Sequence, residues 1–292
     1  MSKTLHIVMG PTAIGKTAYA IGLAQQLDTE IISCDSRQFY KELDIGVARP
    51  SIEELSAIKH HFIACRSITE PYNVYTYEQE ALACLENLFN CHNDIVAVGG
   101  SGLYIDAICQ GIAILPDPLP GLREKLKQQL EQEGIESFQR QLQVLDAAYY
   151  QQVDKQNPIR LQRALEVCIT SGKPYSELLR QQRPQRNFLI HKIILTAPPE
   201  TLRQRINRRV DQMFSMGLES EVAKVSAFRH LNTLNTVGYK EFYEAWDSGS
   251  HNNEVIASAI KTHTWQYAKK QITWIKRDLA NSTHPIDIIE QC

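Results

Sequence analysis

The chain has 292 residues, of which 43% are hydrophobic and 22% are charged, and these proportions exclude a low-complexity or collagen-like protein. No stretch reaches the roughly 18 uncharged apolar residues that a membrane-spanning helix needs. The net charge of -2 does not exclude nucleic-acid binding, because residues 1–116 carry -6 whereas residues 117–186 carry +2.

The first predicted strand, residues 5–9, leads into a phosphate-binding motif. The pattern G-x-x-x-x-G-K-[ST] is matched by Gly10-Pro11-Thr12-Ala13-Ile14-Gly15-Lys16-Thr17, and apolar residues at helical spacing follow to residue 27. The glycines let backbone N–H groups turn toward phosphate oxygens, and the start of the helix adds partial positive charge. Lys16 contributes a full charge, and the Thr17 hydroxyl can ligate Mg²⁺. The motif does not identify the phosphorylated compound.

The second predicted strand, residues 30–34, ends at Asp35. In a doubly wound parallel sheet, ligands gather at the carboxyl ends of the strands, so we expect Asp35 to face the phosphate motif. The alternative is that Asp35 caps a helix or stabilises a turn. A third predicted strand, residues 94–98, ends in Gly99-Gly100-Ser101-Gly102. These glycines permit close approach to a ligand, and Ser101 adds a hydroxyl donor.

The middle of the chain has a different pattern. Helical spacing covers residues 122–130, 134–145 and 158–171, and strand character returns near Ile190. The sequence therefore predicts an α/β fold, a P-loop NTPase-like parallel sheet flanked by helices, built from residues 1–116 and 187–292. Residues 117–186 are predicted to form a helical insertion domain, in which Arg160 and Arg163 share one helix face.

A strand at residues 191–195 precedes a helix that starts near Pro198-Pro199 and carries Arg203, Arg205, Arg208 and Arg209. Arginines on a lid can close over phosphates, and we expect one or two of these four to do so, with the others in solvent. The last predicted helix, residues 256–278, mixes Trp265, Tyr267 and Trp274 with basic residues. Its aromatic rings either stack on nucleic acid or belong to the core.

The seven cysteines form no Cys-x-x-Cys pair, and His60-His61 has no acidic or cysteine cluster at ligand spacing. A disulfide framework, a zinc ribbon and a histidine metal site are therefore not indicated, and His60 and His61 are interpreted as structural or substrate-adjacent. We expect a cytoplasmic monomer that does not bind membranes.

Nine short segments, in order along the chain, carry a resemblance to a known family. They are Gly10–Thr17, Ile31–Tyr40, Asp44–Gly46, His60–His61, Val98–Tyr104, Arg160–Glu166, Met216–Leu218, Val237–Lys240 and Tyr267–Lys269. Together they resemble the tRNA dimethylallyltransferases of the bacterial type, over nearly the whole chain. The phosphate motif alone is shared by many families, whereas the ordered set is specific.

The resemblance implies transfer of the dimethylallyl group from dimethylallyl diphosphate to N6 of the adenosine immediately 3′ of the anticodon, without ATP hydrolysis. The phosphate motif and Mg²⁺ would hold the diphosphate as the leaving group, with Lys16 stabilising its charge. Asp35 would be the general base, and Ser101, where the family usually has Thr, would orient the diphosphate or the adenine. The family's contacts with the anticodon stem-loop of tRNA map onto Asp35, Ser36, Arg37, Gln38, Ser101, Arg123, Ile159, Arg160, Leu161, Gln162 and Arg163.

The chain departs from the family pattern at a few positions. Ile14 stands where Ser is common, Val47 and Arg49 replace Thr and Lys, and Trp265, Lys270 and Ile275 replace Arg, Arg and Phe. The changes in the last helix bear on its contacts with tRNA, not on the reaction.

Three other functions remain as alternatives. A metabolite kinase would use the same phosphate motif, Asp35 and lid arginines, although the helical insertion is longer than a lid needs. A nucleotide-gated RNA-binding module is disfavoured by Gly99-Gly100-Ser101, which replaces the acidic strand end of a hydrolytic motor. Prenylation of a free adenine nucleotide would leave the insertion with little use.

Overall fold

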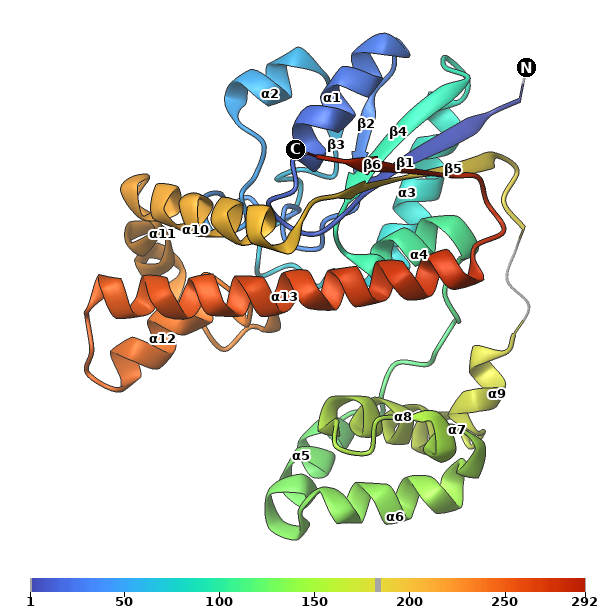
Figure 1. Ribbon diagram of the computed structural model, residues 1–292. Helices are drawn as coiled ribbons and strands as arrows, with labels where there is room; N and C mark the ends of the chain where they lie inside the picture. The colour runs from blue at the N-terminus through green and yellow to red at the C-terminus, as the bar shows by residue number, and fades with distance from the viewer. Residues whose placement is uncertain (1, 182–184, 292) are drawn as a thin grey trace. The chain divides into compact units, whose positions relative to one another are not determined.

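The computed structural model describes residues 2–181 and 185–291 (Figure 1). The chain divides into two compact units. The core unit comprises residues 1–109 and 186–292, and the helical unit comprises residues 110–185. The sequence placed the boundaries of the insertion at residues 117 and 186.

The core unit is built around a six-stranded, all-parallel sheet in the order β3-β2-β4-β1-β5-β6. The strands are β1 (Thr4–Met9), β2 (Ile31–Ser33), β3 (His60–His61), β4 (Asp94–Gly99), β5 (Leu189–Thr196) and β6 (Ile286–Glu290). The central strands are predominantly apolar, as is typical of strands with both faces covered by helices. The predicted parallel α/β sheet is therefore confirmed, with two edge strands, β3 and β6, that the sequence pattern did not reveal.

Helices cover both faces of this sheet (Figure 1). Residues on one face, including Leu5 and Ile7, pack with α3 (Val74–Leu88) and α4 (Gly102–Gln110). Residues on the other, including Val8 and Val96, pack with α1 (Lys16–Gln26) and α10 (Pro199–Ser215). The remaining helices of this unit are α2 (Ile52–Ala57), α11 (Leu218–Val225), α12 (Lys240–Asp247) and α13 (Asn253–Asn281), with short 3₁₀ turns at Ser226–Phe228 and Asn232–Leu234.

The described residues of the helical unit form five helices around a core of their own. They are α5 (Leu122–Glu133), α6 (Ile135–Leu145), α7 (Ala147–Gln152), α8 (Pro158–Ser171) and α9 (Tyr175–Leu179). Phe138, Leu142 and Leu161 are fully buried at its centre. Helix α8 starts as its sequence indicates, because the Asn157 side chain accepts the Arg160 N–H and Pro158 occupies the first turn.

The strand order brings the sequence motifs together. Strands β2, β4 and β1 are neighbours, and they run parallel, so their carboxyl ends lie at one edge of the sheet. The phosphate loop follows β1, Asp35 follows β2, and Gly99 to Ser101 follow β4. This edge is where an open α/β sheet binds its ligands. No helix in the described part of the chain is both long enough and apolar enough to cross a bilayer.

Candidate active site

The phosphate loop has the backbone shape of an anion site. Gly15 adopts a φ of 101°, in the left-handed region that favours glycine, immediately before α1 begins at Lys16. No side chain caps the start of α1, so its first N–H groups can bind an anion. Gly10 is also required, since a Cβ there would lie 2.8 Å from the carbonyl oxygen of Leu195.

Lys16 lies within this loop, and its Nζ donates a hydrogen bond to the Pro11 carbonyl at 2.8 Å. Burial lowers the pKa of the Lys16 ammonium to about 8, the negative charge of Asp35 raises it, and the charge of Arg209 lowers it further. The loop therefore holds a cation that lacks a full counter-charge. An anionic ligand would provide that counter-charge and raise the pKa again.

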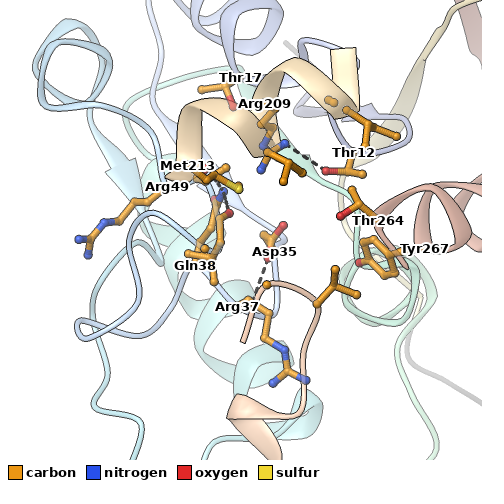
Figure 2. A pocket seen from close by; sticks show the side chains of 18 of the residues that line it. Thr12, Thr17, Asp35, Arg37, Gln38, Arg49, Arg209, Met213, Thr264 and Tyr267 are labelled. Carbon is orange, nitrogen blue, oxygen red and sulfur yellow. Dashed lines mark hydrogen bonds between the residues drawn. The ribbon is translucent and has the colours of Figure 1, made fainter. Parts of the chain in front are cut away.

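Asp35 lies at the carboxyl end of β2 and lines the cavity beside the phosphate loop (Figure 2). Its Oδ1 accepts the backbone N–H of Arg37 at 2.9 Å, which is the turn interaction that the sequence left as an alternative. Its Oδ2 has no hydrogen-bonding partner among the described residues. One oxygen therefore fixes the turn, and the other can act on a ligand.

Ser101 lies at the tip of β4, close to the turn that carries Asp35. Its Oγ accepts the Ser36 N–H at 3.1 Å and is also 3.1 Å from the Ser36 hydroxyl. The Tyr267 hydroxyl on α13 interacts with Ser101. Burial of that hydroxyl and the negative charge of Asp35 raise the Tyr267 pKa to about 12, against the lowering effect of Ser101, although the residue as a whole is 40% exposed. Tyr267 is therefore a neutral hydrogen-bonding group at the cavity.

Two of the four predicted lid arginines reach the site. Arg205 and Arg209 are one helical turn apart on α10, so they share a face, and both line the cavity. Arg205 donates to the Ile14 carbonyl at 3.3 Å, and Arg209 donates to the Thr12 hydroxyl at 3.1 Å. Burial lowers the pKa of Arg209, and Asp35 raises it. Arg203 and Arg208 are exposed and do not line the cavity.

These groups surround a cavity of about 490 Å³. Its walls come from the phosphate loop, residues 35–38, residues 46–49, α10 and α13, and Figure 2 shows Asp35, Arg209 and Tyr267 around the same space. The volume is in the usual range for small-ligand sites. Thr17 and Asp35 also line a smaller adjoining pocket, together with His60. Hydroxyl and carboxylate oxygens are donors that suit Mg²⁺.

No cluster of three or more potential metal-ligating His, Cys, Asp or Glu side chains occurs among the described residues. A metal at the phosphate loop would therefore complete its coordination shell with phosphate oxygens and water, as Mg²⁺ commonly does. His61 is instead paired with Glu30, 2.5 Å from its Nε2, on the edge strand β3.

Gln271 is a buried residue of α13 that the sequence analysis missed. Its Oε1 accepts the Thr12 N–H at 2.8 Å, and its Nε2 donates to the Gly100 carbonyl at 2.9 Å. A Cβ at Gly100 would lie 2.3 Å from that Nε2, so the glycine allows this close approach. Gln271 thus joins the phosphate loop to the tip of β4. The family-like segment Tyr267-Ala268-Lys269, which lies just before Gln271 in the chain, was the sequence signal that could have pointed to this residue.

Glu221 on α11 is a second residue that the sequence analysis missed. Its carboxylate accepts the backbone N–H groups of Asp44, Ile45 and Gly46 at 3.1, 2.8 and 2.9 Å, as well as the Tyr239 hydroxyl at 2.5 Å. Glu221 therefore fixes the segment that forms one wall of the cavity. Gln38 supports the same segment by donating to the Ala48 carbonyl at 3.0 Å.

The predicted tRNA-contacting residues fall into two groups. Ser36, Arg37 and Gln38 follow Asp35 in the core unit, and Arg37 and Gln38 line the cavity. In the helical unit, Arg123, Gln162 and Arg163 surround the carboxylate of Glu166, and Ile159 and Arg160 are exposed. Leu161 is fully buried in the core of the helical unit, as the apolar face of its helix indicates, so its side chain does not face solvent.

Most of the residues at which the phosphate loop and α13 depart from the family pattern pack against the core. Ile14 is 1% exposed and packs in the core beneath the loop. Ile275 is buried, and Trp265 packs against the core. Trp274 lies against Gly102, where a Cβ would be 2.3 Å from its ring, and donates to Asp106 at 3.3 Å. Trp265 and Trp274 are therefore half-buried and pack against the core.

Three comparisons with known proteins agree on one family. A family model described as IPP transferase matches residues 38–278. The tRNA dimethylallyltransferase of Christiangramia forsetii is 48% identical over 278 residues, which is 95% of this chain and 92% of the relative. The crystal structure of the full-length tRNA isopentenylpyrophosphate transferase of Bacillus halodurans is 29% identical, with a TM-score of 0.69, and the match covers 99% of this chain and 90% of that one. A eukaryotic dimethylallyltransferase acting on tRNA shares the fold, with a TM-score of 0.80 at 24% identity, over 99% of this chain and 74% of that one.

Proposed function

This chain belongs to the IPP transferase family, and from that premise we propose that it is a tRNA dimethylallyltransferase. The prenyl donor is dimethylallyl diphosphate, and the acceptor is N6 of the adenosine immediately 3′ of the anticodon. The observation that carries the proposal is the position of Asp35, whose Oδ2 is available at the cavity beside a phosphate loop with an undercompensated lysine.

The phosphate loop supports a diphosphate as the leaving group. Negative charge grows on the bridging oxygen as the allylic C–O bond breaks, and preorganised cations and N–H groups stabilise it. In this chain those groups are the start of α1, Lys16, Arg205 and Arg209. Thr17 is the residue that would hold Mg²⁺, which supplies further neutralisation of the diphosphate charge when bound.

The transfer is a substitution at the allylic carbon. The N6 nitrogen of adenine forms a bond to that carbon, and the bond to the diphosphate oxygen breaks, so the electron pair leaves with the diphosphate. The N6 proton passes to Oδ2 of Asp35, which is needed because an aromatic amine is a weak nucleophile. Ser101 and Tyr267 orient the reactants from the tip of β4 and from α13.

The tRNA must present its adenine outside the base stack. A base inside the anticodon loop cannot reach a cavity of this kind, so the nucleotide flips out before reaction. In this proposal Ser36, Arg37 and Gln38 contact the RNA beside Asp35. The basic residues of the helical unit, Arg123, Arg160 and Arg163, bind the anticodon stem-loop through its phosphates.

One assay tests the proposal against its alternatives. The protein is incubated with Mg²⁺ and labelled dimethylallyl diphosphate together with unmodified tRNA, with AMP, or with ATP and small metabolites. We expect label in tRNA and release of one diphosphate per transfer, without ATP consumption. Label found in AMP alone would indicate a nucleotide prenyltransferase. ATP consumption without prenylated RNA would indicate a kinase, and binding of RNA without either reaction would indicate a non-catalytic module.

A further inference from the structure

A buried carboxylate lies beneath the basic surface of the helical unit. Glu166 on α8 has a side chain that is 4% exposed, and it is surrounded by residues expected to contact tRNA. Its Oε1 accepts hydrogen bonds from Arg123 Nε at 3.2 Å and from Gln162 Nε2 at 3.1 Å. Its Oε2 accepts a hydrogen bond from Arg163 Nη1 at 3.3 Å. One acidic group therefore receives three donors from two helices.

The geometry of α8 explains part of this arrangement. Gln162 and Arg163 precede Glu166 by four and three residues, so all three lie on one face of the helix. Arg123 comes from α5, whose Leu122 and Leu126 pack into the same core as Leu161 and Leu165. The two helices are thereby fixed to each other on their apolar sides. Glu166 joins them on the adjacent polar side.

The partners of Glu166 are much more exposed than Glu166 itself. The Arg123 side chain is 60% exposed and the Arg163 side chain is 35% exposed, so both guanidinium groups keep N–H donors that face solvent. A guanidinium is planar and has five donors, so fixing one edge determines where the other edge points. A long, otherwise mobile side chain that is held in this way loses less conformational entropy when it binds a phosphate.

We propose that Glu166 is a positioning residue of the tRNA-binding surface: it holds Arg123, Gln162 and Arg163 in the orientation in which they contact the RNA backbone, without touching RNA itself. This inference rests on the proposed function. It means that the negative charge of Glu166 strengthens the binding of a polyanion, the tRNA. Simple electrostatics predicts the reverse, because removing an acidic group near phosphates should favour binding.

The inference and simple electrostatics predict opposite changes in tRNA affinity when Glu166 loses its charge, so the variant Glu166→Gln distinguishes them. Gln has nearly the same size but lacks the charge that pairs with both arginines. We expect the KM for tRNA to rise about tenfold, with kcat and the KM for the prenyl donor unchanged. The dependence of the KM on salt should become weaker, because fewer phosphate contacts form. Glu124→Gln, a matched loss of an exposed acid on α5, should leave the KM for tRNA unchanged or lower it.

A second comparison separates positioning from simple stabilisation of the unit. In an Arg123→Ala/Arg163→Ala background, Glu166→Gln should cause a much smaller further rise in the KM for tRNA, because both arginines that it orients are gone and only the neutral Gln162 remains. The thermal unfolding midpoint of each variant shows whether it is folded. If Glu166→Gln does not fold, Glu166→Asp keeps the charge with a shorter reach, and it should raise the KM for tRNA by a smaller factor.

An unchanged or lowered KM for tRNA in a folded Glu166→Gln protein would overturn the inference. So would an unchanged KM in the Arg123→Ala/Arg163→Ala protein, because the surface would then not bind RNA. In both cases the wild-type protein still prenylates tRNA. Absence of label from tRNA with the wild-type protein would instead overturn the proposed function, so the two failures are distinguishable.

Discussion

At the scale of single residues, Asp35 combines two tasks on one carboxylate. Oδ1 holds the turn by accepting the Arg37 N–H, and Oδ2 faces the cavity. Asp35→Asn keeps an oxygen for the turn but cannot accept a proton. We expect kcat to fall by about 10² to 10⁴ in Asp35→Asn and equally in Asp35→Ala, with little change in affinity for inorganic diphosphate. Single-turnover rates and diphosphate binding check this. Near wild-type turnover in Asp35→Asn would show that the carboxylate serves the turn alone.

The charge of Lys16 gives a prediction for pH. Because burial lowers its pKa to about 8, the ligand-free protein loses this charge as the pH rises through that value. The diphosphate needs the charged form, so kcat/KM for the prenyl donor should fall about tenfold per pH unit above pH 8. Bound diphosphate raises the pKa again, so kcat should stay constant to a higher pH. Initial rates from pH 7 to 10 test this, and a flat kcat/KM profile would contradict it.

The control for that profile is Lys16→Arg. A guanidinium stays charged throughout this range, so the variant should lose the fall above pH 8 although its overall activity is lower. If the fall persists in Lys16→Arg, another group is responsible.

At the scale of elements, a buried ion pair fixes α13 to the sheet. Lys192 on β5 lies 2.7 and 2.8 Å from the two carboxylate oxygens of Asp278, and both residues are buried. Lys192→Met leaves a buried carboxylate without its partner, so we expect a loss of about 3–5 kcal/mol in the free energy of unfolding. Lys192→Met/Asp278→Leu removes both charges and should lose much less. Urea denaturation measures both, and equal losses would rule out this explanation.

Strands with a largely apolar pattern could be predicted from the sequence, whereas the short or exposed strands at the edges of the sheet could not. Strands β1, β2, β4 and β5 are buried and were predicted to within about two residues. Strand β3 has two residues, and β6 has exposed positions at an edge of the sheet, so neither shows a buried run. Helix α2 is also short, but it begins at a capping box formed by Ser51 and Glu54, which is a local sequence signal.

The same distinction applies to the candidate site. The phosphate loop, Asp35 and Ser101 were recognisable because each belongs to a local motif at the end of a strand. Gln271 and Glu221 were not, because their partners are far away in the chain: Thr12 is 259 residues from Gln271. Such contacts depend on the tertiary fold. The burial of Leu161, by contrast, follows from the sequence, because its spacing with Ala164 and Leu165 is that of the apolar face of a helix.

At the scale of the whole molecule, the two substrates should differ in their response to salt. In the function that we propose, the prenyl donor is held in a cavity of the core unit, whereas tRNA is bound through exposed basic side chains of the helical unit. Raising the salt concentration should therefore increase the KM for tRNA steeply and the KM for the donor only slightly. In Arg160→Ala/Arg163→Ala, the KM for tRNA should be higher and its salt dependence flatter. Equal salt dependence of the two KM values would contradict this division of roles.

The loop from Gly10 to Thr17 is proposed to hold the diphosphate of a prenyl donor as the leaving group, beside Asp35. The most direct measurement is a crystal structure with the thiolo analogue of dimethylallyl diphosphate, which binds without reacting. We expect both phosphates against the start of α1 and Lys16, with the allylic carbon directed toward Asp35. Phosphates bound at any other place, with this loop empty, would contradict the account.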